Sequence, residues 1–218
     1  MTPIDEIVRG LDNLVRSGKI LYAGLSNFPA WRVATAVTMA ELQGMSPVVA
    51  VQHEYSLVER TAERDLIPMS KAFSLGAVGW SPLGGGLLTG KYRAGETGRK
   101  EGLGAVIHSE DERKAAILDA VMDIAATHDR PAGQIAIAWS LAKGMVPIIG
   151  PRTAEQIADN LAATEVALSS EEIARLDDVS AIGLGVPHEF SRQPNFLDRL
   201  TGGNGERMDL NHHSRALR

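Results

Sequence analysis

The stretch richest in groups that could do chemistry runs from Gly76 to Tyr92 (GAVGWSPLGGGLLTGKY). A short apolar run ends at Trp80, and Ser81, Pro82 and three consecutive glycines follow. Glycines let backbone N–H groups come close to an anion, while a serine hydroxyl adds a hydrogen bond and an indole adds a stacking face. The pattern favours a ligand-binding loop at the end of a strand, with an ordinary glycine-rich turn as the alternative.

Four short apolar runs predict the strands that would position this loop and three others. They cover residues 20–24, 48–52, 77–81 and 145–149, and each ends in a polar or glycine-rich segment. Helical periods separate the runs, so that strand, loop and helix repeat four times. This alternation predicts an α/β fold with parallel strands, in which ligands bind beyond the carboxyl ends of the strands.

Helix signals lie between and after these runs. Thr2 and Thr153 are expected to cap helices, and Pro131 is expected to start one. The expected helices cover residues 3–16, 31–42, 63–73, 110–127, 132–142, 154–161 and 169–179. Residues 93–109, rich in glycine and charge, predict a long surface loop. One domain is expected over residues 1–182, followed by a loosely packed, partly disordered tail over 183–218.

Composition excludes several classes of function. The 218 residues include no cysteine, which excludes a disulfide framework, thiolate catalysis and cysteine-ligated zinc. The net charge of −5, with both signs interspersed, argues against a nucleic-acid surface. No apolar stretch approaches the roughly 20 residues that span a bilayer, and residues 1–20 are unlike a signal peptide. We expect a cytoplasmic protein without a membrane segment, and His212 and His213 are too isolated to predict a metal site.

Four strand ends together resemble the aldo-keto reductase family, most closely its bacterial and potassium-channel-β-like branches. They are GLSNF at 24–28, VQHEYSLVER at 51–60, WSPLGGGLLTGKY at 80–92 and IIGPRTAEQIADNL at 148–161. The resemblance implies a (β/α)8 TIM barrel that binds NADP(H) across its carboxyl face and reduces aldehydes or ketones. This chain would supply only the C-terminal half of that barrel, four βα units, followed by the tail.

The resemblance also implies which residues bind the cofactor. They are Ser26, Asn27, Gln52 and Trp80 at the nicotinamide, Ser81, Pro82, Leu83, Gly84, Lys91 and Tyr92 at the phosphates, and Gly150, Arg152, Gln156, Asp159 and Asn160 at the adenosine. Arg152 would pair with a 2′-phosphate, since a guanidinium binds phosphate oxygens in bidentate fashion. Asp159 corresponds to an acidic position that contacts the adenine.

The catalytic residues stay unassigned. The family's Asp, Tyr, Lys and His lie on the first four barrel strands and their loops. This chain is expected to lack those strands, as it would if it came from an internal start or a gene fragment. Tyr22 belongs to a strand and Tyr55 and Tyr92 belong to two of the motifs, so none of them replaces the acid. His53 is interpreted as a polar loop residue, with a catalytic histidine as the alternative. Four strands leave open edges and an apolar inner face, so a homo-oligomer or a complementing half is expected to cover them.

Three functions therefore remain open. The chain could belong to a reductase lineage that is active only when the missing half is supplied, acting on a small-molecule carbonyl. It could be a regulatory module that binds the cofactor without hydride chemistry. It could also be a half-barrel reused on a pathway intermediate for isomerisation, dehydration or cyclisation at the Trp80 loop. An upstream reading frame that carries a Tyr and a Lys in family context would favour the first.

Overall fold

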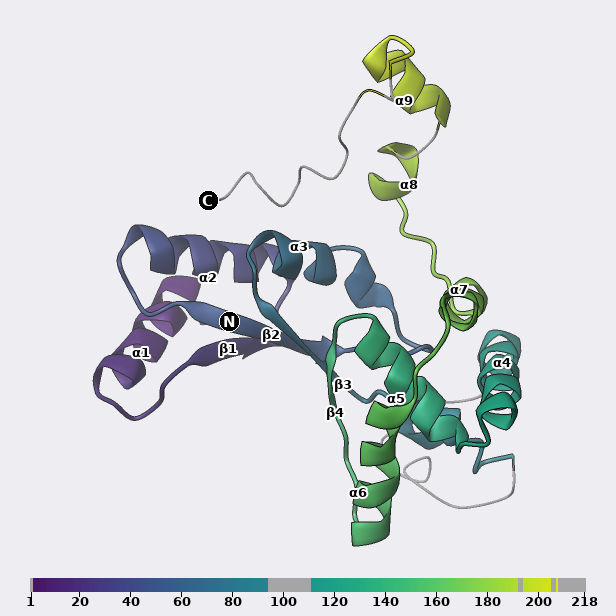
Figure 1. The fold of residues 1–218 in the computed structure, drawn as a ribbon. Helices are drawn as coiled ribbons and strands as arrows, with labels where there is room; N and C mark the ends of the chain where they lie inside the picture. Colours follow the sequence, from purple (N-terminus) through teal and green to yellow (C-terminus); the bar gives the residue numbers. More distant parts are fainter. Residues whose placement is uncertain (1, 94–110, 192–193, 205–206, 208–218) are drawn as a thin grey trace. The chain divides into compact units, whose positions relative to one another are not determined.

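The strands form at the apolar runs. The computed structural model describes residues 2–93, 111–191, 194–204 and 207. Its strands are β1 (Ala23–Ser26), β2 (Val48–Glu54), β3 (Gly76–Trp80) and β4 (Val146–Ile148), and they form one sheet in the order β1-β2-β3-β4 (Figure 1). β3 and β4 run parallel, with Val78 opposite Val146 and Trp80 opposite Ile148. The predicted α/β fold with a parallel sheet of four strands is confirmed, and barrel curvature stays a prediction.

The helices follow the predicted order along the chain. They are α1 (Ile4–Arg16), α2 (Ala30–Leu42), α3 (Leu66–Ala72), α4 (Glu112–His128), α5 (Ala132–Ala142), α6 (Ala154–Leu161), α7 (Ser170–Val179), α8 (His188–Ser191) and α9 (Pro194–Thr201), with 3-10 turns η1 (Thr61–Glu63), η2 (Gly84–Thr89) and η5 (Ala162–Glu165). The loop predicted over 93–109 lies, apart from Arg93, outside the described residues. Within the described part of the chain, no helix is long and apolar enough to cross a membrane.

The first strand begins later than predicted. The backbone N–H groups of Lys19 and Ile20 donate to the Leu14 carbonyl at 3.0 and 3.4 Å, which closes the end of α1. Gly18, at φ +70°, makes this left-handed closure without steric strain. The residues next to the helix end are thereby withdrawn from the sheet, so β1 starts at Ala23.

Three helix starts also differ from the prediction. Thr2 does not cap α1, because Pro3 holds the capping position and the Thr2 carbonyl instead accepts a hydrogen bond from the Arg32 guanidinium at 2.7 Å. The helix predicted over 63–73 is divided between η1 and α3. α4 begins after Asp111, whose side chain accepts a hydrogen bond from the Lys114 N–H at 2.8 Å, so the helix starts two residues later than predicted. The capping residue, rather than the apolar period, fixes this start.

The chain divides into two compact units, which we describe separately. The N-terminal unit comprises Met1–Val51, Ala62–Gly76 and Ile182–Arg218, and the central unit comprises Gln52–Thr61 and Ala77–Ala181. In the N-terminal unit α1 and α2 pack against each other (Figure 1). Its buried core consists of apolar side chains from α1, β1, α2 and β2, namely Val8, Leu25, Val33, Ala36, Ala40, Val48 and Val51.

Asp12 ties α1 to the segment before β2. Its Oδ1 accepts hydrogen bonds from the Ser46 N–H and hydroxyl, both at 2.8 Å, and its Oδ2 accepts one from Arg16 at 2.7 Å. Arg16 also donates to the Gly44 carbonyl. These hydrogen bonds lower the pKa of Asp12, and the bond from the Ser46 N–H has the largest effect. The carboxylate therefore stays ionised and holds the two segments together.

The C-terminal part of this unit carries structure that the sequence did not predict. α8 and α9 form where no apolar period was found, and the rings of Phe190 and Phe196 lie 4.2 Å apart. Arg64 donates to the Gly183 carbonyl at 2.8 Å, which fixes the start of the segment. The domain boundary between residues 182 and 183, with a partly disordered tail beyond it, stays a prediction.

The central unit is built around α5. Every residue from 133 to 140 is buried, and the helix contacts α4, α6, α7, η2, η5 and β4. A helix that is apolar on all sides is one that other elements enclose. Trp139, fully buried, stacks on Tyr55 with ring centres 5.2 Å apart. α5 thus anchors the segment that follows β2.

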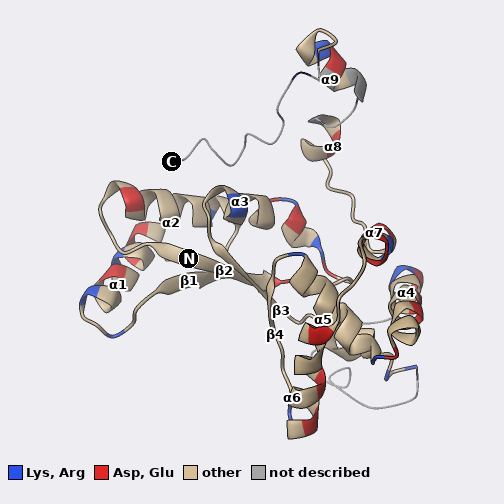
Figure 2. Cartoon of the chain, in the orientation of Figure 1, with Lys and Arg blue, Asp and Glu red and all other residues tan. Residues whose placement is uncertain are grey.

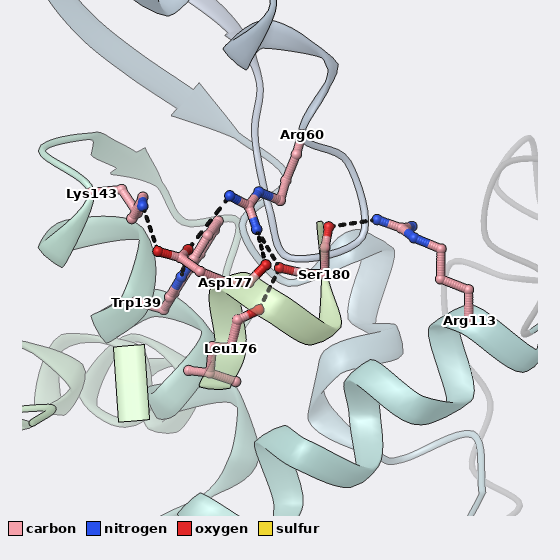
Figure 3. Close-up of polar contacts among 7 residues, drawn as sticks. All are labelled: Arg60, Arg113, Trp139, Lys143, Leu176, Asp177 and Ser180. Atoms are coloured by element: carbon pink, nitrogen blue, oxygen red, sulfur yellow. Dashed lines mark hydrogen bonds and ion pairs between the residues drawn. The ribbon is translucent and has the colours of Figure 1, made fainter. Parts of the chain in front are cut away.

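A buried polar network fastens the same segment to α7 (Figure 3). Arg60, 7% exposed, donates at 2.7 Å to both the Asp177 carbonyl and the Ser180 hydroxyl. The Asp177 carboxylate accepts from the Trp139 indole at 3.0 Å and from the Lys143 ammonium at 2.7 Å. Arg60, Trp139 and Ser180 are buried, whereas the Lys143 and Asp177 side chains are 28% and 27% exposed. Because the buried members are all hydrogen-bonded, they favour one arrangement of the segment over others.

Surface charge contributes much less to this unit. Lys and Arg residues are interspersed with Asp and Glu residues along α4 (Figure 2). Some form exposed ion pairs, such as Arg175 with Asp123 at 2.6 Å. Exposed pairs of this kind stabilise a fold by about 0–1 kcal/mol each. Burial of apolar side chains around α5 is therefore expected to stabilise this unit more than its surface charges do.

Candidate functional site

The loop after β3 turns sharply. Trp80 ends the strand, Ser81 adopts φ +59°, and Gly84, Gly85 and Gly86 follow at +55°, +67° and +96°. The N–H of Gly84 donates to the Ser81 carbonyl at 2.9 Å, and that of Gly85 donates to its hydroxyl at 3.3 Å. A non-glycine residue in the left-handed region is strained, and such residues collect at ligand sites. The predicted glycine loop therefore forms a tight turn at the carboxyl end of β3.

Two residues of the TGKY segment fold back over the glycines. The Tyr92 hydroxyl donates to the Gly85 carbonyl at 2.9 Å. The Lys91 ammonium lies 3.1 Å from the place that a Cβ at Gly86 would occupy, and 5.1 Å from the centre of the Tyr92 ring. The structure therefore brings Lys91 and Tyr92 to the glycine turn. A cation beside closely packed backbone is a donor set that suits a phosphate.

Replacing Gly84 by alanine is expected to lower the free energy of unfolding by about 2–3 kcal/mol. Its φ of +55° is unfavourable for alanine, and the new Cβ would lie 2.7 Å from the Val58 Cγ2, which a stiff β-branched side chain cannot easily withdraw. Gly144→Ala is the matched control, because Gly144 has φ +80° but no atom within 4 Å. It should cost only about 1 kcal/mol. Urea denaturation measures both, and equal losses would contradict the role of packing.

The start of α6 carries a second group of predicted residues. Gly150 follows β4, and the Arg152 N–H donates to Gln156 Oε1 at 2.8 Å. Thr153 caps the helix as predicted, accepting from the Gln156 N–H at 3.3 Å. The pKa of Glu155 is lowered because its carboxylate accepts its own backbone N–H and the Thr153 hydroxyl. The first turn of α6 thus already stabilises a negative charge, as helix N-termini do.

Asp159 and Asn160 lie in the last turn of α6. Asp159 is exposed, and its Oδ1 accepts a hydrogen bond from Gln134 Nε2 at 2.8 Å. Gln134 belongs to α5 and is only 4% exposed. The motifs did not point to this residue. The signal that could have revealed it is a lone amide within the apolar helix sequence AGQIAIAWSLA.

The residues expected at the nicotinamide are divided between the two units. Ser26 and Asn27 lie at the end of β1 in the N-terminal unit, and Asn27 adopts φ +57°. Gln52 on β2 and Trp80 at the end of β3 lie in the central unit. Each stands at or near the carboxyl end of its strand, as predicted. Their joint contact with one ring stays a prediction.

His53 is not a loop residue, so that interpretation was wrong. β2 continues to Glu54, and His53 is a strand residue with 3% of its surface exposed. Its Nδ1 lies 3.3 Å from the Glu54 carbonyl, and Nε2 has no hydrogen-bond partner among the described residues. Burial lowers the pKa of the imidazole, which is therefore neutral at pH 7. A neutral buried ring of this kind belongs to the core.

Metal ligation is not indicated by the described part of the chain. No group of three or more His, Asp or Glu side chains there could hold an ion. The donors at the two loops are the Lys91 ammonium, hydroxyls and backbone N–H groups, and Arg152 stands in the second loop. These bind anions rather than cations.

Comparison with known proteins gives the family of the chain. The profile of the Aldo/keto reductase family matches residues 1–181. The uncharacterized oxidoreductase YrpG of Bacillus subtilis is 39% identical over 82% of this chain and 54% of its own length. Norsolorinic acid reductase of Aspergillus flavus is 32% identical over 87% of this chain and 48% of its own. Versiconal hemiacetal acetate reductase of Aspergillus parasiticus is 32% identical over 81% of this chain and 53% of its own.

The chain spans about half the length of each of these three relatives. The matched region includes all four strands and the loops that follow them. On this match, the chain belongs to the aldo/keto reductase family.

Proposed function

We propose that this chain supplies the NADP(H)-binding half of an aldo/keto reductase barrel, which acts on an aldehyde or ketone once the other half completes it. The sequential strand order supports four consecutive βα units of such a barrel. Members of the family generally use NAD(P)H. Two of the relatives are named as reductases, which supports a small-molecule carbonyl as the substrate.

Two anion-favouring places in one unit carry the proposal. The Lys91 ammonium lies over the glycine turn after β3. Arg152 stands just before α6, whose first turn holds the Glu155 carboxylate. A dinucleotide with a pyrophosphate and a 2′-phosphate requires two such places. The donor chemistry at both loops therefore fits NADP(H).

Each cofactor residue has a distinct task in this proposal. The bound cofactor would supply a hydride to the carbonyl carbon. Trp80 stacks on the nicotinamide, while Ser26, Asn27 and Gln52 orient its carboxamide. The pyrophosphate is lined by Ser81, Pro82, Leu83, Gly84, Lys91 and Tyr92, and the adenosine by Gly150, Arg152, Gln156, Asp159 and Asn160.

The proposal includes a second copy of the chain or a complementing half. β4 is an edge strand of the sheet, and its Val146 and Ile148 are 63% and 41% exposed. Exposed apolar side chains on an open strand edge favour association. A cytoplasmic location is also proposed, since a chain without cysteines suits a reducing compartment. Light scattering that gives the mass of a folded monomer at micromolar concentration would contradict the association.

Titration with NADPH and NADH tests cofactor binding. Arg152→Met is expected to weaken NADPH binding about 10- to 100-fold, because hydrogen bonds between charged groups contribute about 1.5–3 kcal/mol. NADH binding should be unchanged, since NADH lacks the 2′-phosphate. Arg175→Met removes the same charge from exposed α7 and is the control. A folded chain that shows no saturable NADPH binding would overturn the proposed function.

A further inference from the structure

The first turn of α5 touches both parts of the proposed cofactor site. A Cβ built at Gly133 would lie 3.4 Å from Thr89 and 3.5 Å from Leu83, both of which belong to the glycine loop. The next residue, Gln134, reaches in the other direction and donates to Asp159 on α6 at 2.8 Å. All of these residues belong to the central unit. α5 therefore connects the loop expected at the phosphates with the helix expected at the adenosine.

Gln134 is poorly suited to a purely stabilising role. Only 4% of the residue is exposed, and its Oε1 has no hydrogen-bond partner among the described residues. A buried amide with an unsatisfied oxygen opposes folding, and an apolar side chain of the same shape would remove that penalty. The orientation of the amide is nevertheless fixed, because turning it over would place Oε1 against a carboxylate oxygen. The hydrogen bond that Gln134 Nε2 donates restrains the Asp159 side chain.

We propose that Gln134 is a positioning residue that holds the Asp159 carboxylate for the amino group of the adenine, so that the site selects an adenine dinucleotide. This rests on the proposed function. Asp159 is exposed and can reach a ligand, and an ionised carboxylate only accepts hydrogen bonds. The 6-amino group carries the only N–H bonds of an adenine attached to ribose, so it is the partner of Asp159. A hydrogen bond on Oδ1 fixes the plane of the carboxylate for that contact.

The test compares NADPH with reduced nicotinamide hypoxanthine dinucleotide phosphate, which carries a 6-oxo group in place of the amino group. The unaltered chain is expected to bind NADPH about 10-fold more tightly than this analogue. This factor corresponds to about 1.4 kcal/mol, the contribution of one hydrogen bond. Gln134→Met should bring this ratio close to 1 by weakening NADPH alone. Asp159→Asn should also abolish it, because an amide can donate to the 6-oxo group. Gln43→Met, at the exposed end of α2, is the matched control and should keep the ratio.

Combining the two substitutions separates positioning from mere folding. The double variant Gln134→Met with Asp159→Asn should lose no more discrimination than either single variant, since the residues act as one unit. If Gln134→Met does not fold, Gln134→Asn takes its place, because its shorter amide cannot reach α6. A folded Gln134 variant that keeps the 10-fold ratio, or that weakens both dinucleotides equally, would overturn the inference. NADPH binding without discrimination by the unaltered chain would overturn it alone, whereas no NADPH binding would also overturn the proposed function.

Discussion

Replacing Arg60 by methionine is expected to lower the free energy of unfolding by about 3 kcal/mol, because removing one partner of a buried charged network leaves the others unsatisfied. The Ser180 hydroxyl and the Asp177 carbonyl would each lose a donor at 2.7 Å. The guanidinium also lies 5.4 Å from the centre of the Trp139 ring, a contact that methionine keeps only in part. The loss should not exceed this estimate greatly, since Lys143 still pairs with Asp177.

Urea denaturation of the two proteins measures the difference. Arg130→Met is the matched control, because Arg130 is exposed and its nearest contact to Glu165 is 3.4 Å. It should change stability by less than about 0.5 kcal/mol. A loss below about 1 kcal/mol for Arg60→Met would mean that the network in Figure 3 is not formed in solution.

The sequence predicted best what is determined locally. The helix that ends at Val179 begins at a capping box, in which Ser169 and Glu172 each bond to the backbone of the other. Thr153 caps α6, and Pro131 stands at the start of α5. Each of these signals acts within four residues. Local physical chemistry alone is therefore enough to place such helix starts.

Contacts between segments far apart in the sequence were not predicted, because they do not depend on the local pattern. Arg60 bonds to residues 117 and 120 positions away, and Gln134 bonds to a carboxylate 25 positions away. Nothing in the local pattern indicates which buried polar side chain meets which partner. The burial of His53 was missed for a related reason, because its strand continues beyond the apolar run that predicted it. Polar residues at strand ends belong to the core or to the site depending on register alone.

The candidate site could be predicted in part from the sequence. The motif residues stand at the carboxyl ends of their strands, as a parallel α/β fold requires. The fold-back of Lys91 and Tyr92 over the glycines depends on φ angles at Gly84, Gly85 and Gly86 that only glycine adopts readily. The glycines predicted the loop, whereas the position of the ammonium above it could be seen only in three dimensions.

If the chain is half of a reductase barrel, as proposed, the purified chain without a partner is expected to reduce 4-nitrobenzaldehyde with NADPH at least about 10²- to 10⁴-fold more slowly than a barrel with a positioned general acid. That range is the usual contribution of such an acid. Hydride transfer generates an alkoxide that must be protonated. Tyr55 is fully buried and stacked on Trp139, and the Tyr92 hydroxyl is bonded to the Gly85 carbonyl. Tyr22 is 73% exposed to solvent.

Binding and turnover should therefore separate in this chain. The groups expected to hold NADP(H) are present, so saturable NADPH binding can persist while the rate collapses. Loss of the charges that would support the acid should lower the rate little further, since the effects of residues that act as a unit are not additive. Rate measurements at several NADPH concentrations distinguish two causes of a low rate. If binding is weak, more NADPH raises the rate; if proton transfer is missing, it does not. Robust turnover would mean that a residue of this chain supplies the proton, and His53→Gln and Tyr55→Phe would then identify it.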